Sequence, residues 1–149
     1  MQQLGDKLRE GSEGPFARTV VALAQYGLAQ GGELELERGL QALRVADAKH
    51  RLAYALTHAA LVDLRLRRPA QARARCLEAL AIARVIERPS ETLLALTLLA
   101  CASRDLGDLA QAEALRAEIE RQDWACACAS VRSWHASLLG GDQQRPGDT

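Results

Sequence analysis

Aromatic and β-branched residues are scarce in this sequence. Only 3% of its 149 residues are aromatic, and six valines and three isoleucines stand against 28 alanines and 25 leucines. Sheets favour β-branched and aromatic side chains, whereas alanine, leucine, arginine, glutamate and glutamine favour helices. The composition therefore argues against a sheet and predicts an all-α protein, of a length that folds as one domain.

An excess of either charge and a long apolar segment are also missing. Nineteen basic residues balance nineteen acidic ones, so direct binding to nucleic acid is not expected. The longest apolar run, Leu93 to Ala102, has ten residues, about half of what a membrane span needs. The N-terminus lacks the apolar core of a secretion signal, and the four cysteines lack disulfide spacing. We therefore expect a cytoplasmic protein with reduced thiols and no membrane contact.

The sequence repeats itself at a spacing of about 40 residues. A shift of 40 aligns Ala55-Leu56-Thr57 with Ala95-Leu96-Thr97, and Ala70-Gln71-Ala72 with Ala110-Gln111-Ala112. A weaker copy centres on Gly31-Gly32, 36 residues before the corresponding turn of the second copy. This spacing assigns one shared repeat position, where a small side chain lets two helices approach closely, to Ala24, Ala60 and Ala100.

Each copy has the pattern of two helices around a short turn. The first helix of the third copy shows apolar residues at three- and four-residue spacing, namely Leu93, Leu96, Leu99 and Ala100. Gly107 is suited to end this helix and Asp108 to cap the next one. In the second helix of this copy, the residues expected to face inward are Ala112, Leu115 and Ile119. In the second copy, Pro69 suits the first turn of its second helix.

These patterns predict three hairpins, over residues 15–48, 51–88 and 90–122, and then a capping helix over 124–139. Ser90 is the expected cap of the third hairpin, directly after the boundary at Arg88-Pro89. The N-terminal segment 1–14 is expected to contain a short helix near 4–10. The tail 140–149 has no apolar partner and is expected to be disordered.

The repeats resemble the tetratricopeptide repeat, in which a large apolar residue, a leucine and a small residue mark the first helix. An alanine packs early on the second helix of that family. The residues that match are Leu96, Leu99, Ala100, Gly107-Asp108 and Ala112, then Leu56, Ala60 and Ala72, and more loosely Val20, Leu23, Ala24 and Gly31. The family's aromatic positions are occupied by leucine and by small or polar residues. Longer, aromatic-poor repeats of this kind are similar to those of bacterial signal-dependent transcription regulators.

The resemblance implies an α-α superhelix, or solenoid, whose first helices line a concave groove. In the family's register, the candidate partner-binding residues in this groove are Gln25, Tyr54, His58, Leu61, Arg65, Leu94, Leu98, Arg104 and His135. This wall is mostly apolar, which disfavours a clamp for a peptide carboxylate. We expect it to bind a protein or a peptide.

No catalytic or metal-binding constellation stands out in the sequence. Cys126 and Cys128 point in different directions on a helix, and His135 lies two turns from Cys128, too far to share an ion. Cys76 and Cys101 are expected to be close to one another and to stay reduced. The sequence has no phosphate loop and no nucleophile motif, so we expect neither an enzyme nor a cofactor.

The charged stretches have ordinary explanations. The arginines between residues 65 and 75 surround a turn, where they are either solvated or form a docking patch for an acidic partner or a phosphate. Glu33, Glu35 and Glu37 begin a helix, where the helix dipole favours negative charge.

Two functions remain open. The first is a non-catalytic scaffold that binds a protein or peptide in its groove. The second is a sensor segment of a bacterial transcription regulator that binds a small inducer or mediates oligomerisation. The capping helix also carries more apolar residues than one hairpin covers, namely Val131, Trp134, Leu138 and Leu139. These residues bind either a second copy, which makes a homodimer, or the third hairpin of the same chain.

Overall fold

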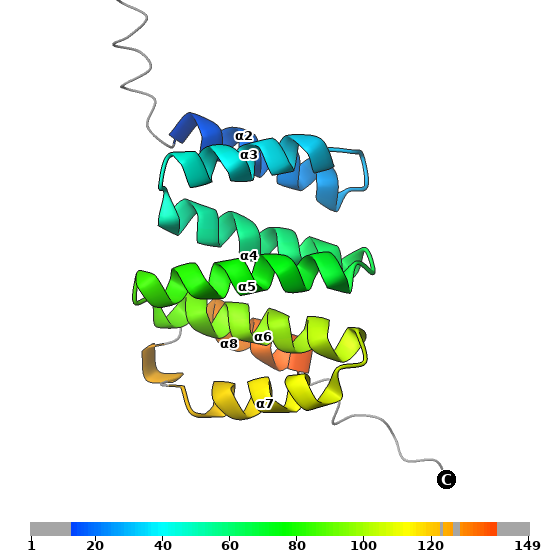
Figure 1. Ribbon diagram of the computed structural model, residues 1–149, viewed down its shortest axis with the longest axis vertical. Coiled ribbons are helices and arrows are strands. Elements are labelled where there is room, and N and C mark those ends of the chain that lie inside the picture. Colours follow the sequence, from blue (N-terminus) through cyan, green and yellow to red (C-terminus); the bar gives the residue numbers. More distant parts are fainter. Residues whose placement is uncertain (1–12, 123, 127–128, 140–149) are drawn as a thin grey trace, which may run out of the picture.

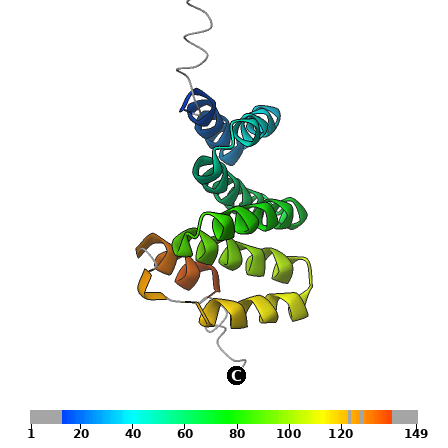
Figure 2. The same cartoon turned by 60° about the vertical axis from the view of Figure 1, so that its left-hand side comes forward.

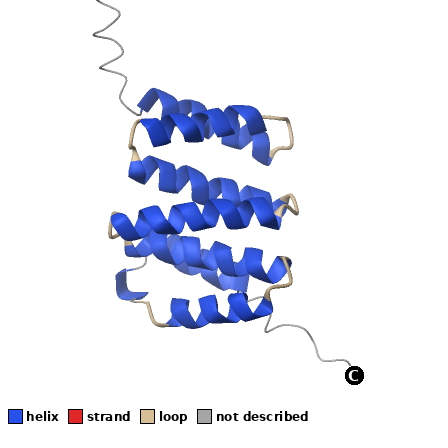
Figure 3. Cartoon of the chain, in the orientation of Figure 1, coloured by secondary structure: helices blue, strands red, loops and turns tan. Residues whose placement is uncertain are grey.

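The computed structural model describes residues 13–122, 124–126 and 129–139, although the side chains of 126, 130, 134 and 137–139 are not part of this description. Within these ranges every regular element is helical and there is no strand, which confirms the all-α prediction (Figure 3). The elements are α2 (Glu13–Gly27), α3 (Glu33–Val45), α4 (Lys49–Arg65), α5 (Pro69–Val85), α6 (Pro89–Asp105), α7 (Leu109–Glu120), a short 3₁₀ turn η1 (Trp124–Cys126) and α8 (Ala129–Leu139).

Consecutive helices pack as antiparallel pairs, α2 with α3, α4 with α5 and α6 with α7, and the pairs stack on one another (Figure 1). Between pairs, α4 contacts both α2 and α3, and α6 contacts both α4 and α5. The last helix, α8, packs on α6 (Figure 2). The first helices α2, α4 and α6 therefore contact one another in sequence, and we call the side that they form the first-helix face.

The hairpin turns are built alike. The backbone N–H groups of Leu28, Leu66 and Leu106 each donate to the carbonyl four residues earlier, and a residue with positive φ follows each of them. In the third turn this residue is Gly107, as predicted, and the carboxylate of Asp108 accepts from the N–H of Gln111 at 3.1 Å, which confirms the predicted cap. Pro69 begins α5, as predicted.

The predicted cap at Ser90 is wrong. Helix α6 already begins at Pro89, with Arg88 in the capping position. Proline needs no N–H partner in the first turn and its φ is fixed at a helical value, so it starts the helix one residue earlier than a serine cap would.

The predicted equivalence of Ala24 with Ala60 and Ala100 is also wrong, because the first copy is displaced by two residues. The equivalent turn leucines, Leu28 and Leu66, are 38 residues apart, not 36. Three buried threonines follow the same spacing, and each donates its hydroxyl to the carbonyl four residues earlier: Thr19, Thr57 and Thr97. The buried small residue of the first copy is therefore Ala22, whereas Ala24 is exposed.

The two additional residues lie in the first turn, which spans 28–32 where the other hairpin turns span three residues. Gly32 closes this turn with a φ of 85°, and a Cβ atom on it would lie 2.7 Å from the carbonyl oxygen of Ala22. Only glycine meets both conditions. The turn therefore holds α2 tightly against the start of α3.

A continuous apolar core runs through the stack. Leucines of α3, α4 and α6 are fully buried in it, and so are the small residues between them. The residues of the third copy that were predicted to face inward are buried, which confirms that prediction: Leu93, Leu96, Leu99, Ala100, Ala112, Leu115 and Ile119. The predicted short helix near 4–10 and the predicted disordered tail lie outside the described residues.

Candidate functional site

The first-helix face carries an aromatic and apolar patch at its N-terminal part. The Phe16 and Tyr54 rings meet edge to face with their centroids 5.7 Å apart, and the Tyr54 and His58 rings are 4.1 Å apart. Tyr54 is 47% exposed, and Val20, on the same face of α2, is 40% exposed. We call Phe16, Val20, Tyr54 and His58 the aromatic patch.

Repeat symmetry relates the residues of this patch. With the spacings of 38 and 40 residues, Phe16, Tyr54 and Leu94 occupy one position, and Val20, His58 and Leu98 occupy another. Burial at the second position increases along the stack: Val20 is exposed, His58 is half-buried and Leu98 is fully buried. Since α8 packs on α6, the C-terminal part of this face is already covered, while the part over α2 and α4 is open.

The residues predicted to bind a partner are distributed over four different surroundings. Tyr54 and His58 lie in the aromatic patch, and Leu94 is half-buried at the position equivalent to Tyr54. Leu61 and Leu98 belong to the core, so neither offers its side chain to a partner. Arg65 and Arg104 lie at the C-terminal ends of α4 and α6, with Arg104 3.7 Å from Asp105.

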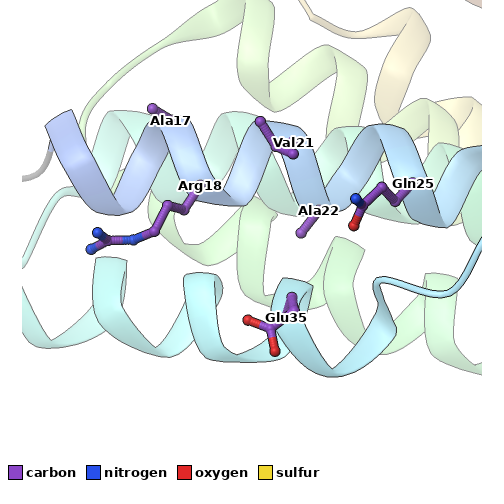
Figure 4. A pocket seen from close by; sticks show the side chains of 6 residues that line it. All are labelled: Ala17, Arg18, Val21, Ala22, Gln25 and Glu35. Carbon is purple, nitrogen blue, oxygen red and sulfur yellow. The ribbon is translucent and has the colours of Figure 1, made fainter.

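Gln25 and His135 lie away from the aromatic patch. Gln25 is exposed and lines an open hollow of about 360 Å³ between α2 and α3, together with Ala17, Val21 and Glu35 (Figure 4). The family's register placed Gln25 in the groove only because of the two-residue displacement of the first copy. His135 is half-buried on α8, where its ring meets that of Trp124 edge to face at 4.7 Å.

Of the residues predicted to mediate self-association, Val131 is buried within the chain. It belongs to the same core cluster as Leu98, so it contributes to the contact of α8 with α6. The side chains of Trp134 and Leu138 lie outside the described residues, as does that of Leu139.

A buried polar network joins the first two hairpins, and it was missed by the sequence analysis. The hydroxyl of Tyr26 in α2 donates to Asp63 in α4 at 2.5 Å. Arg75 in α5 donates to the other oxygen of Asp63 and to Glu37 in α3, both at 2.6 Å. The guanidinium groups of Arg68 and Arg75 also lie 5.6 and 5.7 Å from the Tyr26 ring centroid. The only sequence signal was a charged residue at an apolar position of each helix.

The ionisable groups of this network are shifted by their surroundings. Burial raises the pKa of the Tyr26 hydroxyl, and its hydrogen bond to Asp63 adds to this effect. Burial also raises the pKa of the Asp63 carboxyl, against the opposing effect of Tyr26 and Arg75. Asp63 is fully buried and bonded on both oxygens, so the network connects four helices and does not face a substrate.

The network also changes the interpretation of the charged stretches. Arg75 binds Asp63 and Glu37, and Arg68 binds Glu33 at 3.2 Å, so two of the arginines between residues 65 and 75 serve contacts within the chain. A docking patch for an acidic partner would have to use the remaining ones. The acidic residues at the start of α3 have partners in the chain, which the dipole explanation did not require.

No group of three or more histidine, cysteine, aspartate or glutamate side chains in the described ranges is placed to hold a metal ion. The side chains of Cys126 and Cys128 lie outside those ranges. Cys76 and Cys101 are buried free thiols, and burial strongly raises the pKa of the Cys76 thiol, so this sulfur is a poor nucleophile. Across the helices that the structure describes, none is both long and apolar enough to span a membrane.

No protein-family model, curated protein or solved structure matches this chain. The resemblance to the tetratricopeptide repeat therefore depends on the repeat pattern of the residues, and the candidate site depends on the geometry described above.

His58 makes the stability of the fold depend on pH. Burial lowers the pKa of His58 below its usual value near 6.5, so the unfolded chain takes up a proton that the folded chain resists. Stability is therefore complete above pH 6.5 and decreases as the pH falls through that value towards the lower pKa of the folded state. We expect a lower melting temperature at pH 5.5 than at pH 7.5, and a smaller difference in His58→Gln. An unchanged difference in the variant would show that His58 does not carry the effect.

Proposed function

We propose that this protein is a non-catalytic, tetratricopeptide-like scaffold that binds another protein or a peptide on its first-helix face. The proposed binding site is the aromatic patch of Phe16, Val20, Tyr54 and His58. We place the scaffold in the cytoplasm, which the buried free thiols of Cys76 and Cys101 support.

One observation carries the proposal: an apolar, aromatic surface is open over α2 and α4 at positions that α8 covers on α6. Leu98 is fully buried, whereas Val20 at the equivalent position is 40% exposed. A helix of the chain itself thus packs on the equivalent surface, and an apolar segment of a partner would bury Tyr54 and Val20 in the same way. Exposed tyrosines with an apolar surround are frequent binding hot spots.

The sensor alternative has less support. A small inducer is usually held in a pocket that encloses most of its surface. The hollow of about 360 Å³ beside Val21 and another of about 220 Å³ beside Glu37 and Arg75 are both open at the surface. Neither supplies such an enclosure.

Tyr54→Ala should weaken partner binding at least about tenfold, because it removes the most exposed ring of the patch. The measurement begins with selection of peptides from a displayed library on the intact chain. Their dissociation constants are then compared by fluorescence anisotropy for the intact chain and the variant, with circular dichroism to verify folding.

Leu77→Ala is the matched control, since Leu77 is 49% exposed on α5, a second helix of the stack. It should bind the selected peptides as tightly as the intact chain does. If the peptides lose affinity equally for both variants, or for neither, the aromatic patch is not the binding site.

A further inference from the structure

The outer side of α2 is an apolar stripe that no helix of the described structure covers. Its residues lie at spacings of four, three and four, and all are exposed: Ala17, Val21, Ala24 and Leu28. Val21 is 59% and Leu28 68% exposed. The hollow between α2 and α3 lies beside this stripe, with Arg18 and Glu35 at its edges (Figure 4).

Repeat symmetry indicates that this surface is of the kind that a helix covers. The α2 residues that line the hollow are Ala17, Arg18, Val21 and Gln25. Their equivalents in α4 and α6 are all buried: Ala55, Leu56, Ala59 and Asp63, and Ala95, Leu96, Leu99 and Ser103. In α4 this side meets the preceding hairpin, as the bond from Tyr26 to Asp63 demonstrates. The same side of α2 has kept its alanines, which allow close approach of a helix.

The opposite end of the stack is not a suitable occupant. Where α5 has the buried residues Cys76 and Leu80, α7 has Arg116 and Glu120, which are 40 residues further along. Head-to-tail stacking of two copies would place these charged groups against the apolar stripe, and burying them there is costly. Open chains of copies are therefore disfavoured.

We infer that two copies of the chain pair through α2, antiparallel and related by a twofold axis. A twofold axis between Val21 and Ala24 places Val21 of each copy on Ala24 of the other, and Leu28 on Ala17. Each large side chain thus meets a small one, and the 4-3-4 spacing keeps the seam continuous along two packed helices. Arg18 and Glu35, of opposite charge, lie beside the seam, so it carries no excess charge of one sign.

The dimer should be weak. Two paired helices bury less than the roughly 1,600 Å² of a standard interface, so a dissociation constant of about 10–100 μM is expected. Sedimentation equilibrium of the intact chain between about 5 and 500 μM should then show a monomer–dimer equilibrium. A monomer at every concentration overturns the proposal.

Three variants identify the surface. Val21→Asp should weaken the dimer at least about a hundredfold, because each copy then buries an aspartate. The exchange Val21→Ala with Ala24→Val keeps one large and one small side chain in every pair, so it should preserve the dimer. Tyr54→Ala should also preserve it, since Tyr54 belongs to the aromatic patch, and this separates the dimer from the proposed peptide binding.

Each of the other outcomes overturns the pairing. A dimer that persists in Val21→Asp forms elsewhere in the chain, and a dimer abolished by the exchange variant is not antiparallel about this axis. Because Val21 and Ala24 are exposed in the single chain, circular dichroism should show unchanged helicity in all variants.

Discussion

Replacing Leu98 by aspartate should unfold the protein. Leu98 is fully buried in α6, beneath the helix α8 that packs on it, and it belongs to the core cluster. Loss of a buried leucine costs about 2–5 kcal/mol, and a carboxylate in its place adds the cost of a desolvated charge without a partner. The sum approaches the roughly 5–15 kcal/mol that stabilise a domain of this size.

Val20→Asp is the matched control, because Val20 holds the same repeat position in α2 and is 40% exposed. It should change the free energy of unfolding by less than about 1 kcal/mol. Urea denaturation followed by circular dichroism compares the two variants. If Leu98→Asp stays folded and is as stable as Val20→Asp, α8 does not cover this position and the first-helix face is open along its whole length.

This contrast marks the limit of the sequence analysis. The three- and four-residue spacing of leucine and alanine predicts the helices, and Gly107 and Asp108 predict a turn, because these signals are local. The family's register also predicts that Leu98 faces the groove. The return of α8 onto α6 reverses the exposure of Leu98, and no local pattern indicates where a last helix packs.

The first copy shows a second limit. A comparison without gaps fits the turn and α3 at a spacing of 36, but α2 follows at 38 because the first turn contains two more residues. Ala24 and Gln25 were therefore assigned to positions that Ala22 and Leu23 occupy. Three buried threonines at one repeat position, Thr19, Thr57 and Thr97, were the signal that could have fixed the register.

The buried network was missed for a different reason. Aspartate and arginine in a helix usually indicate a solvent-facing side, and Asp63 and Arg75 are 12 residues apart with many other charges nearby. Their position is the signal: Asp63 continues the buried stripe of Leu56 and Ala59, and Arg75 lies between Ala72 and Ala79. Two opposite charges at core positions of adjacent helices predict an ion pair.

Arg75→Leu should destabilise the fold by about 3–5 kcal/mol, because it leaves Asp63 charged, fully buried and without its cationic partner. Glu37→Ala provides the comparison. Glu37 also binds Arg75, but its side chain is 49% exposed, so its loss should cost less than about 1 kcal/mol. Urea denaturation measures both variants.

The double variant Arg75→Leu with Asp63→Leu should regain at least about 2 kcal/mol relative to Arg75→Leu. Burial raises the pKa of Asp63 even beside Arg75, which indicates that the carboxylate pays a desolvation cost that the pair only partly offsets. Leucines at both positions remove that cost and extend the surrounding core, while the Tyr26 hydroxyl loses its acceptor and retains a contact to Gln71 at 3.5 Å. Additive effects of the two substitutions would mean that Asp63 and Arg75 stabilise the hairpins independently and not as a pair.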